Sequence, residues 1–475
     1  MGKNSQQRRA VKQRRQDKQD RQKHHDRPGQ HNAARGTGPG APSTDRERAE
    51  QLNSQQLQQT LLTVARLGDD AGTKTRFDNS VQALTAIEIG AATKGWVSEA
   101  IAGILHRLVG SLFEGGWQPA DVAHLVKRER TMRAQRLAVA LIAGQSREHD
   151  ALTRAPEPWL SQLEDLGIYD PAKNILIGGH SEAFGRWSVV EKLHADERIA
   201  IALQVMTTLL RAPRLEFIVD TPSKWGASNR GSIPKPQSAA ARGDIDAKAL
   251  KLIRALLAKA EATTFEAEAE AFTAKAQEMM TRYSIDAAVL ASAAKGHGSA
   301  IGIESRRVHI DNPYADEKAT FLSIISDVNG ARCIWSPSAG FATIMGFPVD
   351  LHLTDLLFTS LLVQATKASA EATSLDRRQR TPSYRRAFLI AYAIRIGERL
   401  EAAKRHMSAE AEHDYGDSLL PILADRQSAV DAAYEDAFPN STPMRSRSLD
   451  AGGYHAGRAA ADRAQIGTGE AISRT

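Results

Sequence analysis

Apolar residues recur at helical spacing through the first half of the chain. In VSEAIAGILHRLVGSLF they fall three or four positions apart, which places them on one face of a helix. These residues are Val97, Ile101, Leu105, Leu108 and Leu112. Glycines at 115–116 predict the end of this helix, and Pro119, with Gln118 before it, suits the start of the next. Further helices are expected at 158–166 and 196–211.

The pattern changes in the second half, where short apolar runs alternate with long helical ones. Strands are expected at 305–310, 331–337 and 341–347, and SPSAG connects the last two as a hairpin. Long helices fit 350–373 and 383–407, and LDAGGYHAGRAAADRAQIG predicts one last helix. The expected fold is therefore mainly α, with a small antiparallel sheet (α+β) in the C-terminal half after a helical N-terminal domain.

The most regular pattern is KLIRALLAKAEATTFEAEAEAFTAKAQEMMTRYSID, from Lys251 to Asp286. Its apolar positions predict two helices that bury one seam against each other. The first helix would supply Leu250, Ile253, Leu257 and Ala260, and the second Phe265, Ala269, Phe272, Ala276, Met279 and Tyr283. Thr263 and Glu266 form a capping-box signature, and the short turn makes the helices antiparallel.

The glutamates of this hairpin admit two readings. Glu266 and Glu270 lie four positions apart on one helix face and could act as a carboxylate pair. However, acidic residues in a first helical turn are favoured by the helix dipole, and the hairpin contains no histidine. Residues 247–286 hold six basic and six acidic side chains, so the hairpin alone is a poor phosphate-binding surface. We therefore interpret it as a structural element.

Charge is concentrated at the N-terminus. Residues 1–40 hold eleven Lys or Arg against three Asp, a net charge of +8, whereas the whole chain has +6. Residues 1–46 contain almost no apolar residues, so we expect a disordered basic arm. Such an arm would either bind nucleic acid or an anionic surface, or only keep the protein dissolved. The predicted domains are a helical domain at 47–220, a Pro-, Gly- and Ser-rich linker at 221–244, and a hairpin plus α+β domain at 245–470.

Composition excludes several classes of protein. Cys333 is the single cysteine, so neither an intrachain disulfide framework nor a Cys-rich zinc site is available. No apolar run approaches the ~20 residues that a membrane span requires, and the N-terminus lacks the apolar region of a secretory signal. We expect a soluble cytoplasmic protein that does not contact a membrane.

The hairpin sequence, KLIRALLAKAEAT followed by EAEAEAFTAKAQEMMTRYSID, closely resembles the domain of unknown function numbered 2786, an uncharacterised bacterial and phage family. GWQPADVAHLVKR at 116–128 is similar to the upstream helical region of its actinobacterial members. DNPYADEKATFLSIISDVNGARCIWSP, LLFTSLLVQAT and RRAFLIAYAIRIGERL resemble the downstream α+β region. The resemblance covers about 50–465 and leaves out the basic arm. It implies an α-rich fold with a small sheet, and no established activity.

Catalytic motifs are scarce. The chain has no HExxH, CxxC or G-x-S-x-G, and NILIGGHSEAFGRWS matches neither Gly-rich phosphate-binding loop, so we expect a turn there. Two Glu-x-x-His pairs, Glu191–His194 and Glu410–His413, could join further carboxylates at a metal site, but they fall in different predicted domains. Cys333 lies in an apolar strand, which favours a buried hydrophobic role over a nucleophilic one. We assign no catalytic residue, metal ligand or cofactor.

Two basic clusters remain. VKRERTMRAQR contains five basic residues, and DRRQRTPSYRR places a tyrosine among arginines, which is a reasonable platform for phosphates and bases. The candidate nucleic-acid residues are Arg377, Arg378, Arg380, Tyr384, Arg385, Arg386, Arg395 and Arg399. The other interpretation is a solvated, charge-rich loop.

The sequence favours a non-enzymatic protein that associates with DNA or RNA, or with a protein partner, through the basic arm and the Arg-rich loop. The alternative is a metal-dependent, hydrolase-type enzyme built on carboxylates and histidines. A phage- or defence-linked interaction protein is a third possibility.

Overall fold

The computed structural model describes most of the chain after the basic arm. The described residues are 43–91, 93–179, 183–226, 251–256, 258–259, 275–276, 278–288, 302–375, 381–415, 419–439, 441 and 450–464. The chain forms two compact units, Met1–Asn53 and Ser54–Thr475. The predicted arm lies almost entirely outside the described residues, and everything below concerns the second unit, apart from residues 43–53 at the start of the first helix.

The first half of this unit is helical, as predicted. The helices are α2 (Ser43–Leu67), α3 (Lys74–Ile89), α4 (Trp96–Glu114), α5 (Pro119–Glu129), α6 (Met132–Glu148), α7 (Ala151–Arg154), α8 (Glu157–Asp165), α9 (Ala183–Val190), α10 (Ala195–Arg211) and the 3₁₀ turn η1 (Pro222–Lys224). The expected start of α5 is confirmed, because Pro119 is its first residue. Asp121 accepts a hydrogen bond from the Gln118 backbone N–H at 2.9 Å, which satisfies a donor left over at the helix start.

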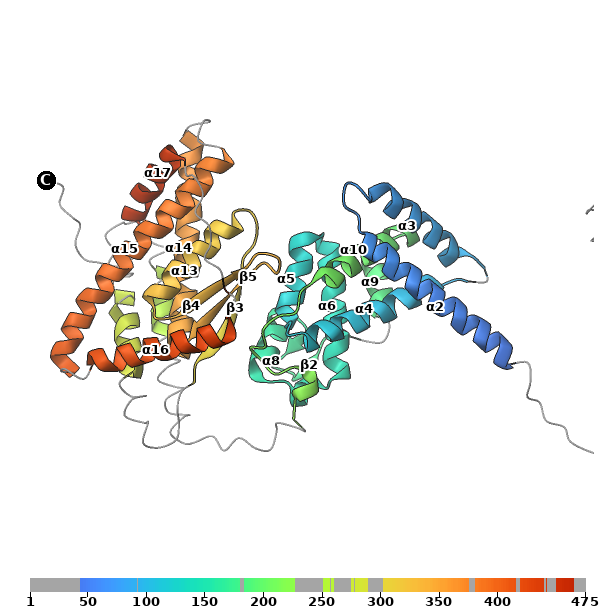
Figure 1. The fold of residues 1–475 in the computed structure, drawn as a ribbon, viewed down its shortest axis with the longest axis horizontal. Helices are drawn as coiled ribbons and strands as arrows, with labels where there is room; N and C mark the ends of the chain where they lie inside the picture. The colour runs from blue at the N-terminus through green and yellow to red at the C-terminus, as the bar shows by residue number, and fades with distance from the viewer. Residues whose placement is uncertain are drawn as a thin grey trace, which may run out of the picture. The chain divides into compact units, whose positions relative to one another are not determined.

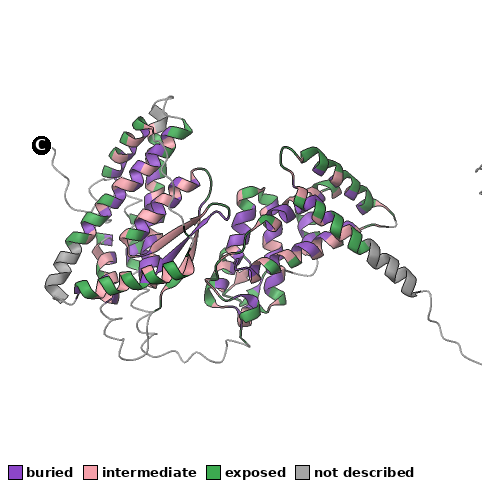
Figure 2. Cartoon of the chain, viewed as in Figure 1, coloured by how far each residue is buried: buried purple, intermediate pink, exposed green. Residues whose placement is uncertain are grey.

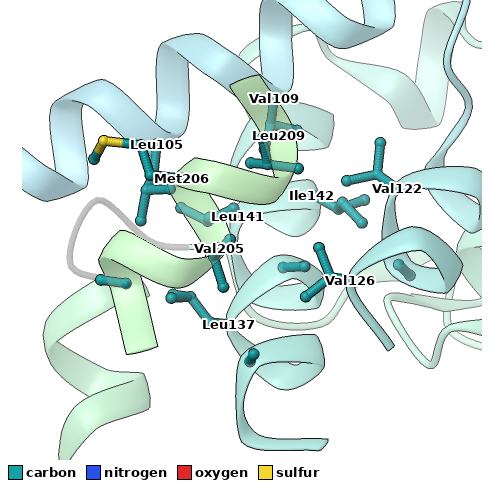
Figure 3. Packing of buried hydrophobic residues seen from close by; sticks show 14 of the residues in the cluster. Leu105, Val109, Val122, Val126, Leu137, Leu141, Ile142, Val205, Met206 and Leu209 are labelled. Carbon is teal, nitrogen blue, oxygen red and sulfur yellow. The ribbon is translucent and has the colours of Figure 1, made fainter. Parts of the chain in front are cut away.

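A hydrophobic core joins α4, α5, α6 and α10. Figure 3 shows side chains from these four helices converging. Among them are Leu105, Val109, Val122, Val126, Leu137, Leu141, Val205 and Met206. Ala339 and Phe341 of the second half belong to the same core. The rings of Trp117 and Phe341 pack edge to face, with 6.2 Å between their centres.

On α4, Val97, Ile101 and Leu105 are buried as the apolar spacing predicts. Leu108 and Leu112 are half-buried, and Val109 and Phe113 are buried instead, so the buried face shifts by one position toward the end of the helix.

The Gly-rich stretch at 174–179 forms a turn after a very short ladder. Strands β1 (Tyr169–Asp170) and β2 (Ile175–Leu176) pair antiparallel, a feature that the sequence did not predict. Gly178 and Gly179 both have positive φ, and a Cβ on Gly179 would collide with the backbone of Ala143. Glycine is thus required for backbone conformation and close packing, in agreement with the predicted turn.

The second half contains a three-stranded antiparallel sheet in the order β3-β5-β4. Its strands are β3 (Glu304–His309), β4 (Arg332–Ser336) and β5 (Phe341–Gly346). All three strands and the hairpin between β4 and β5 are confirmed. The register pairs His309 with Phe341 on one side of β5 and Ser336 with Phe341 on the other.

Helices of the second half pack against this sheet or against one another (Figure 1). They are α13 (Ala315–Val328), α14 (Pro348–Leu375), α15 (Pro382–Tyr415), α16 (Leu419–Ala437) and α17 (Ala451–Asp462). The helices expected at 350–373, at 383–407 and near the end of the chain are confirmed, whereas α13 and α16 were not predicted. Figure 2 shows buried positions on α13, α14, α15 and the sheet, which form a second core.

The α15–α17 pair packs unusually closely. Gly453 and Gly457, four residues apart, face the α15 backbone, and a Cβ on either one would collide with the carbonyl of Tyr384 or Phe388. The Asp450 carboxylate accepts a hydrogen bond from Gly453 N–H at 2.8 Å and caps α17. Small residues therefore set the distance between these two helices.

The hairpin is described in part. Residues 251–256 and 278–288 are helical, and Ile253 and Ala276 are fully buried, as the seam predicts. Met279 and Tyr283 are half-buried, while Met280 is 1% exposed, so the buried face is rotated from the predicted one. The remaining seam residues lie outside the described residues, together with Thr263, Glu266 and Glu270.

The domain division stays a prediction. Residues 221–226, at the start of the predicted linker, are described, and Trp225 is buried in the first core. The rest of the predicted linker lies outside the described residues. In the part of the chain that the structure describes, no helix is both long enough and apolar enough to span a bilayer.

Candidate ligand-binding pocket

Polar side chains converge on a cavity of about 100 Å³ in the second half of the chain. Its wall is formed by the second hairpin helix, the end of α13, the start of α14, the last part of α15 and α16. These elements contribute Thr281, Ser284, Asn329, Phe347, Asp350, Lys404, Arg426 and Gln427, with apolar residues between them. The cavity therefore combines five segments that are far apart in the sequence.

Asp350 is the most buried polar group of the pocket, with 4% of its surface exposed. Ser284 Oγ donates a hydrogen bond to Asp350 Oδ1 at 2.6 Å, and Arg426 Nη2 donates to Oδ2 at 2.7 Å. Burial raises the pKa of Asp350 because it penalises the charged carboxylate, and Arg426 and Ser284 oppose this shift. Both carboxylate oxygens are thus satisfied inside the protein.

The two cations of the pocket are held by different contacts. The Arg426 guanidinium lies 3.9 Å from the centre of the Phe347 ring, which adds a cation–π interaction to its ion pair with Asp350. Lys404 Nζ donates to the Val328 carbonyl at 2.7 Å, at the C-terminal end of α13, where the helix dipole favours a positive charge. Both cationic groups are therefore held by contacts within the protein.

This arrangement is suited to binding a small polar group. It offers two cations, two hydroxyls and one carboxylate in a space of a few water molecules. Among the described residues that line the cavity, none is histidine or cysteine. Hydrogen bonding and charge are therefore the chemistry that these side chains provide.

Sequence reasoning did not single out Ser284, Asp350, Lys404 or Arg426. It identified the hairpin as the organiser of the second domain, but no motif connects residues 284 and 426. The pocket could not be predicted from the sequence, because its lining residues are distant in the chain and only folding brings them together.

The predicted nucleic-acid residues fall into different environments. Arg377, Arg378 and Arg380 lie outside the described residues. Tyr384 is 5% exposed and belongs to the second core, Arg385 is half-buried, and Arg386 is exposed with Nε 3.7 Å from Glu317 Oε1.

Arg395 and Arg399 contact α17. Arg395 is hydrogen-bonded to Asp462 and to Glu398, the latter at 2.7 Å. Arg399 donates to the carbonyls at the end of α17, including Ala464 at 2.6 Å. These contacts satisfy carbonyls that a helix end leaves without partners. The nucleic-acid role of the whole set stays a prediction.

The other basic cluster, VKRERTMRAQR, is used within the fold. Arg130 binds Asp69 at 2.8 Å, and both side chains are 14% exposed. Lys127 binds Asp311 at 3.0 Å, Arg128 donates to the Pro337 carbonyl at 2.8 Å, and Arg133 and Arg136 both pair with Glu191. The local excess of positive charge seen in the sequence is thus partnered in the structure.

The Glu-x-x-His pairs have separate surroundings. Glu191 is held by Arg133 and Arg136, while the His194 backbone N–H donates to Glu197 at 3.3 Å at the start of α10. The side chains of Glu410 and His413 lie outside the described residues. Within the described residues, no three His, Cys, Asp or Glu side chains are grouped so that they could hold a metal ion.

Cys333 lies on β4, partly buried against the second core. Burial raises its thiol pKa to about 12, so the thiol stays protonated at neutral pH. This supports the hydrophobic role expected for it.

A second group of ionisable residues connects α5 to β3. Asp121, 1% exposed, binds Arg307 through Oδ2 and His309 Nε2 through Oδ1, the latter at 2.9 Å. His124 lies beside His309, with 4.7 Å between ring centres, and its Nε2 is 3.0 Å from the Gly340 carbonyl oxygen. Although burial raises the pKa of Asp121, Arg307 and His309 hold it below its usual value. We call these four residues the α5–β3 cluster.

Comparison with known proteins identifies one segment. Neither a curated protein nor a solved structure matches the chain. Residues 248–287 match the family model described as "Protein of unknown function (DUF2786)". The segment includes Met280, Thr281, Ser284 and Ile285 of the pocket wall. The family that the hairpin sequence resembles is therefore confirmed: residues 248–287 of this chain are a DUF2786 segment.

Proposed function

We propose that this protein is a non-enzymatic binding protein whose ligand, or a group of it, enters the cavity beside residues 280–285. The observation that carries the proposal is the convergence of Lys404, Arg426 and the Ser284–Asp350 pair on one small cavity. Buried ionisable groups gathered in a concave site are a frequent property of ligand sites.

The cost of this arrangement supports a binding role. Asp350 is an ionisable group that folding removes from water, and a well-packed apolar side chain would avoid that cost. Its two hydrogen bonds fix Ser284 and Arg426 before any ligand arrives. Preordered side chains lose little entropy on binding, which favours affinity.

Methyl-detected NMR of the full chain tests this proposal. Met280, Ile285 and Leu423 line the cavity and supply methyl probes, and Ile101 in the first core is a matched control. We expect at least one class among small cationic, neutral and anionic compounds to shift the cavity methyls in a saturable manner while Ile101 stays unchanged. If no class shifts them, the proposal fails.

A second candidate function, association with nucleic acid, has its own basis. The net charge of +8 on residues 1–40 would attract a polyanion. Arg385 and Arg386 at the start of α15 would add contacts if the Arg-rich loop takes part.

Salt dependence measures this second candidate. Removing residues 1–40 should flatten the fall of log affinity with log salt, by about 0.7–0.9 for each phosphate that the arm would neutralise. Arg385→Gln with Arg386→Gln should have a smaller effect than the deletion. Absence of DNA or RNA binding by the intact chain at about 50 mM salt would exclude the role.

A further inference from the structure

We propose that the pocket binds an oxyanion of phosphate size, either free or as the phosphoryl group of a small molecule. This inference rests on the binding function proposed above, and it names the class of ligand. The step from pocket to ligand depends on charge, on unused donors and on volume.

The charges of the pocket favour an anion. The described lining residues include two positive side chains, Lys404 and Arg426, and one carboxylate, Asp350, so their net charge is +1. A bound cation would face both of these positive groups at short range, and the half-enclosed site screens them less than bulk water would. An anion would instead be attracted by both.

The donors of the pocket are only partly used. Arg426 gives Nη2 to Asp350, and its Nε and Nη1 have no hydrogen-bond partner among the described residues. Lys404 gives one hydrogen bond, to Val328, from an ammonium group that has three protons. The Thr281 hydroxyl also lines the cavity and donates to no described residue.

Ser284 and Asp350 have a different role. The Ser284 hydroxyl proton already goes to Asp350 Oδ1, and Asp350 Oδ2 holds Arg426. They are positioning residues, because they fix the Arg426 guanidinium through Nη2 and leave its Nε and Nη1 for the ligand. A planar guanidinium held in this manner offers a paired donor arrangement that matches two oxygens of a phosphate.

The volume limits the ligand. A cavity of about 100 Å³ holds several water molecules, since roughly 10–15 Å³ of such space is enough for one. Pockets that enclose drug-sized ligands reach roughly 300–1,000 Å³, so a whole nucleotide does not fit. A tetrahedral oxyanion fits, and so does the phosphoryl end of a larger molecule that remains outside.

The test is a titration of the full chain with inorganic phosphate, followed by the methyl signals of Met280 and Ile285 at constant ionic strength. Lys404→Gln and Arg426→Gln should each weaken phosphate binding by roughly tenfold or more, as expected when a charge-assisted hydrogen bond is removed. Thr281→Val should weaken it by a smaller factor. The matched control is Arg405→Gln, which removes the same charge from the exposed neighbour of Lys404 and should leave the affinity within about twofold.

The outcomes separate the inference from the proposed function. Saturable phosphate binding that Lys404→Gln weakens and Arg405→Gln does not supports the inference. Equal weakening in these two variants, or an equal response to chloride, overturns it. If neutral or cationic compounds bind and phosphate does not, the binding function stands and the oxyanion assignment fails; if nothing binds, both fail.

Two further measurements complete the design. A nucleoside monophosphate that binds at least tenfold more tightly than phosphate would identify a carried phosphoryl group, and equal affinities would identify the free anion. Because Arg426→Gln leaves Asp350 without its ion-pair partner, its circular dichroism must match that of the intact chain. If that variant does not fold, Lys404→Gln and Thr281→Val still decide the result.

Discussion

At the residue scale, His124 shows how burial and neighbouring charge control one titration. Its side chain is 8% exposed, and its Nε2–H donates to the Gly340 carbonyl. Burial, the adjacent His309 and Lys127 lower its pKa to about 4, against the opposing effects of Asp311 and Gly340. In the folded protein His124 is therefore neutral at pH values at which an unfolded histidine is already protonated.

The expected consequence is a loss of stability in acid. Between pH 6.5 and 4 the unfolded state binds a proton at His124 that the folded state does not, so the free energy of unfolding falls as the pH falls. The contribution is on the order of 3 kcal/mol, and it is complete near pH 4, where the folded state also becomes protonated.

Urea unfolding of the intact chain and of His124→Gln, at several pH values, measures this contribution. The difference in unfolding free energy between the two proteins should change over pH 6.5–4 and stay constant above pH 7. His455→Gln, at an exposed position on α17, is the control and should leave the pH profile unchanged. Parallel profiles for His124→Gln and the intact chain would contradict the prediction.

Individual residues were the least predictable from the sequence. A run of arginines reports charge, but the sequence does not show which carbonyl or carboxylate will face each one. The sequence places Arg399 in the candidate nucleic-acid set but does not predict that it donates to carbonyls at the end of α17, more than sixty positions away in the chain. Asp350 and Arg426 had no local signal at all, because their partners come from other elements.

At the scale of elements, the contact between α15 and α17 depends on glycine. A methyl group at Gly457 would meet the backbone of Phe388, which cannot move without displacing α15. Gly457→Ala should therefore lower the free energy of unfolding by about 1–3 kcal/mol, although alanine is the better helix former.

Thermal or urea unfolding followed by circular dichroism measures this effect. The control is Gly185→Ala on α9, where an added Cβ meets nothing within 4 Å. That substitution should be neutral or stabilising by up to about 1 kcal/mol. Equal effects of the two substitutions would show that close packing of α17 is not limiting.

Most elements were predictable because their apolar period is strong. The positions of α4, α5 and α10, the first half of the buried face of α4, and the three strands β3, β4 and β5 follow from spacing and turn residues. α16 was not predicted, and its buried residues explain why: Leu419 and Val430 are its buried positions, so its sequence carries little periodic signal. The face of the second hairpin helix was rotated in the prediction because Met279 and Met280 are equally apolar, and only packing selects Met280.

At the scale of the whole second unit, the α5–β3 cluster connects the first core to the sheet. Asp121 and Arg307 are 1% and 3% exposed as side chains, and Arg307 also donates to the carbonyls of Gly116 and Glu216. Phe341 lies under the same guanidinium at 4.8 Å. Removing one member of a buried pair leaves an unpaired charge, which typically costs about 3–5 kcal/mol.

Asp121→Asn should therefore lower the free energy of unfolding by about 3–5 kcal/mol. The first and second cores should then unfold in separate transitions. Tryptophan fluorescence is dominated by the first core, whereas circular dichroism reports helices in both. The two signals should coincide for the intact chain and diverge for Asp121→Asn. Asp311→Asn, at a half-exposed partner of Lys127, should cost less than about 1 kcal/mol and keep the signals coincident. Coincident transitions in Asp121→Asn would disprove the coupling.

The pocket wall combines residues of the matched family segment with residues outside it. The DUF2786 segment contributes a threonine and a serine hydroxyl, while the two cations belong to α15 and α16, over a hundred positions downstream. The match at residues 248–287 therefore does not include the two cations of the pocket, so the match by itself does not predict which ligand this chain would bind.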